Sequence, residues 1–341
     1  MALVRSGIVS AVVLLLPMIA RGQAPELPSP ELKKDLAIED LDQPVALAMF
    51  ASDALPGDHL LVLEAGGRLL IADVTKPMPP PRELATLTPQ GEAGSGQATC
   101  LLQLDDKTVL AGFGVGGRSL RGVAVFRIEP TADGPTAKLR QRVKELMPET
   151  IADLPGRYAA VAANNRHVYF ALTNLAEGGL LARARHTAGM LSALRPLATA
   201  RDLPDDLSPR AVAVGPDGYV VAAFASSADS GPAARLIFAD PEPSDGSGAP
   251  VVMEFDLPGV CALAYGPAPR PQRHRLYALA ASDGEGGESG LYRVDAAVDA
   301  AGKMTGSATL LAPFPRPVAM AFSPDGVMYV LTLGETSTTG A

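Results

Sequence analysis

The residue of this chain whose position most suggests chemistry is Glu64. It ends the apolar run of residues 60–63 (LLVL), which has the composition of a buried strand. The matching positions of later repeats hold Leu172, Ala280 and Thr332. A carboxylate in a mostly apolar column could bind a polar ligand, and the alternative is a rim residue paired with Arg68 or Arg82.

Three arginines stand just before, or at the start of, predicted strands: Arg157, Arg210 and Arg316. If those strand starts gather around a central channel, the guanidinium groups could form a ring that binds an anion. The alternative is a solvated or salt-bridged rim. Together with Glu64, these three arginines are the predicted binding residues of a channel mouth.

The motifs that usually mark cofactor, metal or catalytic sites are weak here. Residues 112–117 (GFGVGG) fit GxGxxG, but a dinucleotide site needs a helix next, and residues 118–126 favour a strand. The acidic loop at 283–288 has no regular spacing of calcium ligands. Four scattered histidines and the absence of GxSxG, HExxH and CxxCH motifs leave the catalytic residues unknown. We predict no cofactor and no metal, and leave open whether the chain is an enzyme.

Composition limits the classes of partner. The 341 residues are 47% hydrophobic, which suffices for a core, and their formal net charge is −8. Such a charge disfavours nucleic acid, whose phosphates need a basic surface. The chain has no Trp, so a stacking platform for sugars or bases is poorly supplied. The expected partner is a protein or small molecule of unknown identity.

The N-terminus has the pattern of a signal peptide. Arg5 precedes an apolar run over residues 8–19, and the small residues Ala20 and Gly22 fit a cleavage site. We therefore predict a signal peptide at 1–22, a Pro-rich lead-in at 23–32 and one domain at 33–341. An uncleaved anchor is the alternative. No later segment is apolar enough to cross a bilayer, so a secreted or periplasmic protein is expected.

The domain is built from an internal repeat. A motif of alternating Ala and large apolar residues recurs, with its first Ala at positions 46, 160, 211, 262 and 319. The gap of 114 residues between the first two holds a further copy at 97–104 (QATCLLQL), whose register is uncertain by one residue. Six repeats of roughly 50–60 residues, each with four short strands and turn signals, predict an all-β, six-bladed β-propeller of four-stranded blades.

The two ends of the chain raise a problem of ring closure. Residues 33–41 have the pattern of a fourth strand that precedes the first blade, so the N-terminal segment would complete the last blade. The last repeat shows only two strands before residues 334–341 (GETSTTGA), so this blade is predicted to be incomplete, without its third strand. Either the N-terminal segment moves inward to pair with the open edge, or the natural chain is longer, which we expect. Residues 137–147 alone have a helical pattern.

Two cysteines, Cys100 and Cys261, start short apolar strands in the second and fifth repeats. Export would allow a disulfide, but these repeats lie across the ring from each other. Because bridged Cα atoms must lie within about 7 Å, we predict two separate buried thiols.

Some of these segments resemble known propellers. Residues 41–49 and 60–73 look like the first blade of glucose/sorbosone dehydrogenases, which place a Glu at the position of Glu64. The Pro-Asp-Gly turns at 216–218 and 324–326 resemble NHL-type and gluconolactonase-like propellers. The sorbosone-type family also carries a His in its second blade, beside a bound quinone. Residues 99–104 contain no His, so the resemblance transfers Glu64 alone.

Two functions follow as hypotheses. One is an exported binding or scaffold module that offers its channel mouth or rim to a partner. The other is a sugar dehydrogenase of the glucose/sorbosone type, or a lactonase-like hydrolase, that uses the channel mouth. Since the sequence supplies few candidate catalytic residues, we favour the binding module.

Overall fold

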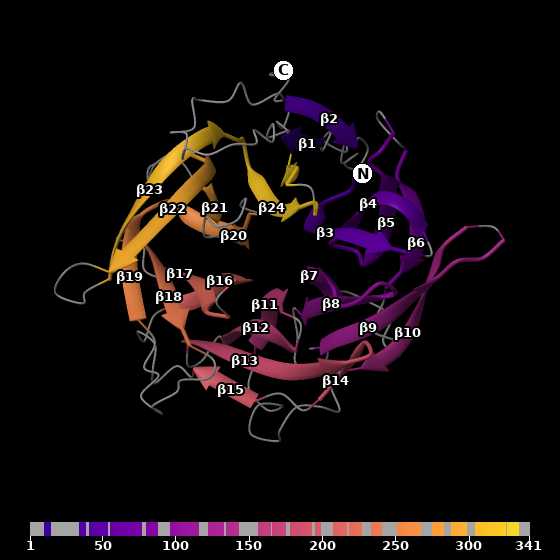
Figure 1. The fold of residues 1–341 in the computed structure, drawn as a ribbon, viewed down its shortest axis with the longest axis horizontal. Coiled ribbons are helices and arrows are strands. Elements are labelled where there is room, and N and C mark those ends of the chain that lie inside the picture. The colour runs from indigo at the N-terminus through magenta and orange to yellow at the C-terminus, as the bar shows by residue number, and fades with distance from the viewer. Residues whose placement is uncertain are drawn as a thin grey trace, which may run out of the picture.

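A computed structural model gives the protein an all-β fold (Figure 1). It describes residues 10–14, 34–38, 41–53, 55–76, 80–87, 96–115, 122–132, 134–142, 156–164, 166–174, 178–192, 195–198, 207–216, 218–226, 233–240, 251–266, 275–282, 288–298, 304–324 and 326–333. Within these residues no helix is long and apolar enough to span a membrane.

Five antiparallel sheets are propeller blades, and each is made from one continuous stretch of chain. Blade one contains β3 (Pro44–Ser52), β4 (Leu55–Glu64), β5 (Arg68–Asp73) and β6 (Arg82–Thr86). Blade two contains β7 (Gly96–Gln103), β8 (Thr108–Val115), β9 (Gly122–Glu129) and β10 (Thr136–Arg142). Blade three contains β11 (Gly156–Ala163), β12 (His167–Asn174), β13 (Gly178–Thr187), β14 (Met190–Leu191) and β15 (Arg195–Ala198).

The chain continues into blade four with β16 (Leu207–Val214), β17 (Val220–Ser226), β18 (Ala233–Ala239) and β19 (Val251–Asp256). Blade five contains β20 (Gly259–Tyr265), β21 (Leu276–Ala281), β22 (Gly290–Val298) and β23 (Met304–Pro313). A further sheet, here called the composite sheet, joins β24 (Pro317–Phe322) and β25 (Met328–Thr332) to β1 (Ser10–Leu14) and β2 (Lys34–Ile38).

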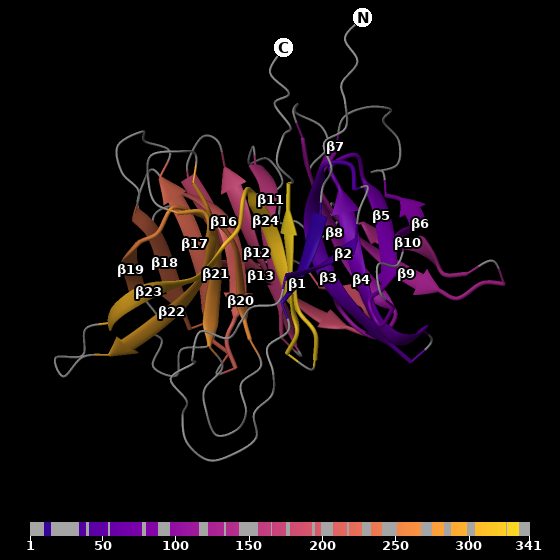
Figure 2. The same cartoon turned by 90° about the horizontal axis from the view of Figure 1, so that it is seen from above.

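The sheets stand around one axis with their first strands innermost (Figures 1 and 2). Going round, β3 contacts β7, then β11, β16, β20 and β24 follow in turn, and β24 contacts β3. The hydrophobic core consists of six clusters, each formed between two neighbouring sheets. The β-propeller of four-stranded antiparallel blades predicted from the repeat is therefore confirmed.

The repeated alanines lie at one structural position, directly after a β-bulge in each inner strand. The register shifts between Pro44 and Ala46, and again before Ala160, Ala211, Ala262 and Ala319. In blade two the same shift precedes Cys100, which resolves the uncertain register of that repeat. A bulge bends a strand and increases its twist, so this position suits a small residue where inner strands converge.

The composite sheet corrects the prediction of an incomplete last blade. Its order is β2-β1-β25-β24, so Ser10–Leu14 occupies the third position and pairs along its whole length with β25. The fourth strand expected at 33–41 is present as β2, Lys34–Ile38. The sequence prediction placed the apolar run that forms β1 in a signal peptide and so did not count it as a strand of this sheet. Residues 334–341 lie outside the described residues.

Two side-chain amides join neighbouring blades by imitating the backbone of a strand. Gln103 of blade two donates to Ala51 O (2.7 Å) and accepts from Ala51 N (3.1 Å) of blade one. Gln141 donates to Leu191 O (3.0 Å) and accepts from Leu191 N (2.9 Å), which connects blade two to blade three.

Gln141 lies in β10, so the helical pattern predicted from residue 137 onward is wrong over 137–142. Pairing with β9 prevails over a local helical preference.

The ring has two faces. We call the face at which the inner strands begin the start face. The opposite face, where the inner strands end and connect to the second strands, is the turn face. Glu64 and Arg68 flank the connection between β4 and β5, on the start face. The connections from β11 to β12 and from β16 to β17 lie on the turn face.

Candidate functional site

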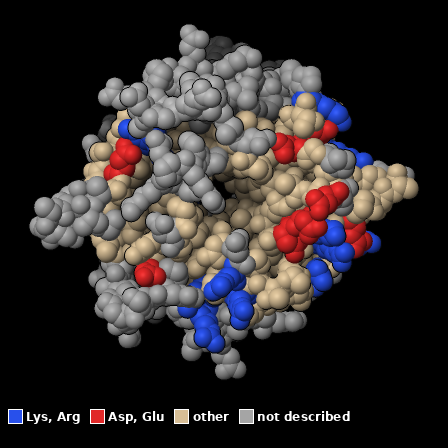
Figure 3. Space-filling model, in the orientation of Figure 1, with Lys and Arg blue, Asp and Glu red and all other residues tan. Residues whose placement is uncertain are grey.

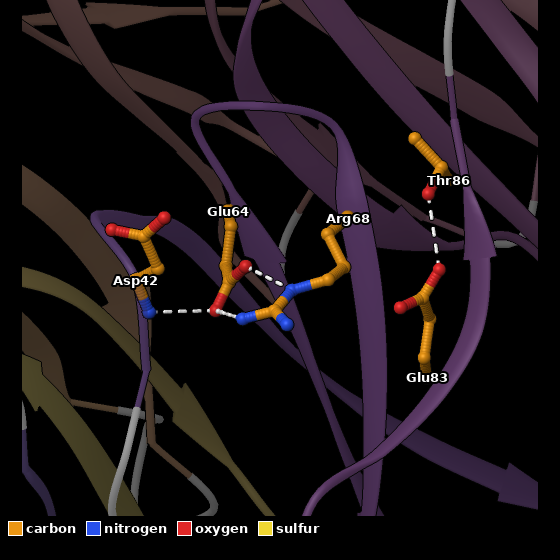
Figure 4. Close-up of polar contacts among 5 residues, drawn as sticks. All are labelled: Asp42, Glu64, Arg68, Glu83 and Thr86. Atoms are coloured by element: carbon orange, nitrogen blue, oxygen red, sulfur yellow. Dashed lines mark hydrogen bonds and ion pairs between the residues drawn. The ribbon is translucent and has the colours of Figure 1, made fainter.

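Glu64 is buried, with 3% of its surface exposed, and is held from two directions (Figure 4). Its Oε2 accepts from Arg68 Nε at 2.5 Å, and its Oε1 accepts from Arg68 Nη2 at 2.9 Å. The backbone N–H of Asp42 donates to Oε1 at 2.7 Å. The alternative pairing with Arg68 is therefore confirmed, but Glu64 is not a rim residue, because the Arg68 side chain covers it.

This arrangement is a structural ion pair. The hydrogen bond from Arg68 to Glu64 is the main reason why the pKa of Arg68 is raised above its ordinary value. Glu64 lies opposite Pro44 in the register, and the equivalent pairs place Leu172, Ala280 and Thr332 in the same column, as predicted. Both carboxylate oxygens of Glu64 are engaged within the protein and are poorly placed to bind a ligand.

The predicted arginines do not join Glu64. Arg210 is the bulged residue of β16, Arg316 directly precedes β24, and both are exposed. The side chain of Arg157 lies outside the described residues. Among the residues that the structure describes, no hydrogen bond or ion pair links Arg210 or Arg316 to Glu64. The anion ring at the start face stays a prediction.

A pocket that the sequence did not predict opens on the turn face. Its volume is about 500 Å³. The ends of three successive inner strands, β11, β16 and β20, meet there, so the pocket lies at the mouth of the channel. Its lining comprises Ala163, Asn164, Arg166, Val214, Gly215, Pro216, Gly218 and Tyr265.

Asn164 shapes the blade-three side of the pocket. Its Oδ1 accepts from the backbone N–H groups of Arg166 (2.9 Å) and His167 (2.8 Å), which is the pattern of an Asx-turn. Its Nδ2 donates to the hydroxyl of Tyr169 at 3.3 Å. Because the turn is tied internally, it presents the exposed Arg166 side chain from a fixed backbone.

The blade-four side of the pocket is a tight turn packed against an aromatic ring. Gly215 N donates to Tyr219 O (2.8 Å), and Gly218 N, in a residue at φ +86°, donates to Gly215 O (3.0 Å). A Cβ added at Gly215 would lie 3.2 Å from Tyr265 Cζ, so the Tyr265 ring rests on the Gly215 backbone. The Pro-Asp-Gly signal predicted this turn but not its role in a pocket.

Within the described residues, the motifs weighed for metal or nucleotide binding do not form such a site. Within the described residues no group of three or more His, Cys, Asp or Glu side chains could hold a metal ion. Most of the acidic loop at 283–288 lies outside those residues. The GxGxxG segment runs through the end of β8, and the next described element is the strand β9, as predicted.

The two cysteines are separate free thiols, as predicted, but only Cys100 is fully buried, and Cys261 is partly exposed. The Cys261 thiol lies within hydrogen-bond distance of Leu279 O (3.2 Å) and Pro317 O (3.4 Å) as a donor. Desolvation raises the pKa of each thiol to about 12. Thiolate is the nucleophilic form of cysteine, so neither residue is primed for nucleophilic chemistry at neutral pH.

Comparisons with known proteins concern the fold. No family model matches the chain, and no curated protein matches its sequence. It is similar to the structure of an α-L-arabinofuranosidase of Fusarium graminearum in complex with arabinobiose (8% identity, TM-score 0.54, 85% of this chain and 93% of that chain covered). It is also similar to a gluconolactonase from Xanthomonas campestris (14%, 0.51, 95% and 97%) and a luciferin-regenerating enzyme (13%, 0.50, 89% and 81%).

Identities this low establish shared architecture alone. The fold therefore defines the chain as a β-propeller, and the resemblance to gluconolactonase-like propellers is supported at the level of the fold. Because one propeller architecture hosts many activities, function has to be argued from the site.

Proposed function

We propose that the chain is an exported, six-bladed β-propeller that acts as a binding module and holds its ligand in the turn-face pocket. The observation that carries this proposal is the pocket of about 500 Å³ at the channel mouth. Sites for small ligands are typically cavities of roughly 300–1,000 Å³ with a few well-placed polar groups. Arg166 and Tyr265 supply such groups beside the apolar side chains of Ala163, Val214 and Pro216.

Two observations support the six-bladed and exported parts of the proposal. The composite sheet packs against blade five on one side and blade one on the other, as a sixth blade would. The basic start, the apolar run and the small residues at 20 and 22 support a signal peptide and a secreted or periplasmic location.

The enzymatic alternative is less well supported by the geometry. Glu64 is the one residue that the resemblance to sugar dehydrogenases transfers, and Arg68 and Asp42 N occupy both of its oxygens. A lactonase or glycosidase would need a free acid or base near its substrate. The named activities of similarly folded proteins still suggest which ligands to try.

The test is ligand-observed NMR with arabinobiose, glucono-δ-lactone and gluconate on the purified protein. We expect saturation transfer to at least one of them, and its loss in Tyr265→Ala, which removes the aromatic wall. Arg316→Ala, which removes an exposed side chain on the opposite face, is the matched control and should bind like the wild type.

Other results would contradict the proposal. Binding that survives Tyr265→Ala but is lost in Arg210→Ala or Arg316→Ala would move the site to the start face. Hydrolysis of glucono-δ-lactone well above the uncatalysed rate would establish an enzyme instead of a binding module.

A further inference from the structure

Three exposed arginines on blade three have no acidic partner among the described residues. They are Arg166 in the turn between β11 and β12, Arg185 in β13 and Arg195 in β15. Within the described part of the chain, none of the three side chains forms an ion pair. Some cations elsewhere are paired, as Lys138 is with Glu129 and Arg293 with Asp295. What sets these three apart is that they belong to one blade of a chain whose net charge is −8.

The strand register brings these arginines to one side of the blade. Arg183 of β13 lies opposite Arg195 of β15 and opposite Tyr169 of β12. Arg185 follows two residues later, so it projects to the same side as Arg183. We call Arg166, Arg185 and Arg195 the arginine cluster.

This side of blade three faces blade four, which forms part of the pocket wall. Tyr169 is buried in a cluster with Val212 and Val220 of blade four, so the shared side points toward blade four. The turn that joins the strands of Val212 and Val220 forms the pocket wall, and Arg166 forms part of the opposite wall. His186 N donates to Arg166 O at 3.0 Å, so the Arg185 end of β13 lies beside the turn between β11 and β12 that contains Arg166.

The surface of the molecule agrees with this placement. Figure 3 shows Lys and Arg side chains gathered over blade three, below the central hollow, whereas over blades one and two Asp and Glu side chains lie among Lys and Arg side chains. Positive charge without neighbouring acidic side chains is therefore seen on the blade-three side of this face. The pocket lies next to the positive side.

We infer that the turn-face pocket binds a small molecule that carries an oxyanion, either a carboxylate or a phosphate, with Arg166 as its direct partner. This inference rests on the proposed function and specifies its ligand. A guanidinium group donates in a planar fork that matches two oxygens of either anion. The other arginines of the cluster add a positive field that attracts the ligand toward the pocket.

The experiment is isothermal titration calorimetry at low ionic strength with three probes: gluconate, inorganic phosphate and neutral arabinobiose. For an anion that binds, we expect Arg166→Ala to raise Kd by about tenfold or more, as loss of a charge-assisted hydrogen bond should. Arg185→Ala should raise Kd less, and its effect should shrink with added salt because it acts at longer range. Arg316→Ala removes the same charge on the other face and should leave Kd unchanged.

The probes separate this inference from the proposed function. Binding of arabinobiose that depends on Tyr265, without binding of either anion, would overturn the anion inference and leave the binding module intact. Equal loss of anion binding in Arg166→Ala and Arg316→Ala would show that net charge alone matters, which also overturns it. Titration by gluconate alone, or by phosphate alone, would identify the oxyanion. Failure of all three probes would contradict both proposals.

Discussion

Glu64 shows that a residue can break a sequence pattern for structural reasons. Its carboxylate is buried, and its partners are the Arg68 guanidinium and the Asp42 backbone N–H. Sequence identified the residue and two possible partners, Arg68 and Arg82, but it could not show that both oxygens would be occupied. That fact depends on the path of the chain before β3, which brings Asp42 N to Glu64.

Replacing Glu64 should therefore cost stability. In Glu64→Ala the Asp42 N–H loses its acceptor and Arg68 loses its anion, so the free energy of unfolding should fall by about 2 kcal/mol. The loss is not larger because Arg68 is 41% exposed and can regain water. Urea unfolding measures the change. Lys76→Ala breaks the exposed pair with Asp73 and should change stability by less than about 0.5 kcal/mol. Equal effects of both variants would refute a special role for burial.

Thr108 is also a buried polar residue, but unlike Glu64 it has an unsatisfied polar atom among the described residues. It is 1% exposed, and its Oγ1 has no hydrogen-bond partner within the described residues. Thr108→Val keeps the shape and removes an unsatisfied hydroxyl, so stability should stay equal or rise by up to about 1 kcal/mol. Thr108→Ser keeps the hydroxyl, loses a methyl group and should destabilise. A marked loss in Thr108→Val would mean that the hydroxyl has a partner in solution.

The thiols predict how stability responds to alkaline pH. Burial raises the pKa of Cys100 from 9.0 to about 12, so the folded state keeps the proton that the unfolded chain releases. The contribution of Cys100 is fully present below pH 9 and is lost progressively between pH 9 and 12. Cys100→Ala should therefore flatten the decline of the unfolding free energy in that range. If wild type and variant decline in parallel, the thiol is not desolvated as described.

At the scale of the element, the inner strands were predictable because their alanines recur with the repeat. The fourth strand β2 was predictable because residues 33–41 have the pattern of a strand that precedes the first blade. The helical pattern at 137–142 misled because β10 is an outer strand, rich in charge, whose pairing with β9 decides its conformation. The pocket could not be predicted because its walls come from the turns of three blades, and each turn is ordinary on its own.

The amide links should contribute to stability by joining blades. Gln141→Leu removes two hydrogen bonds to Leu191 and leaves that backbone without partners, so we expect a loss of about 1–2 kcal/mol. Gln103→Leu should act similarly through Ala51. Arg140→Leu, an exposed neighbour on the same strand, is the control. A control that destabilises as much as Gln141→Leu would show that the substitutions act on β10 itself.

At the scale of the whole molecule, ring closure depends on the composite sheet. β1 pairs with β25 on one side and β2 on the other, so a chain without residues 1–22 would leave both edges open. We expect that truncation to lower the melting temperature by more than about 5 °C relative to the full chain. Exposed edges also invite association, so size-exclusion chromatography should show oligomers.

A matched truncation of residues 1–9 leaves β1 intact and should melt like the full chain. If both truncations melt alike, β1 adds nothing to the ring. Mass spectrometry of the protein recovered from its native host would show which N-terminus the cell retains.

The segment that forms β1 is both a strand of the composite sheet and part of the apolar run of the proposed signal peptide. An export machinery reads an apolar leader only while that leader is extended and accessible. Once Ser10–Leu14 is the third strand of a four-stranded sheet, the same residues are hidden by their neighbours. If residues 1–22 act as the proposed signal peptide, folding and export would compete for this one segment. We would then expect chains that close the ring early to be retained and slowly folding chains to be exported.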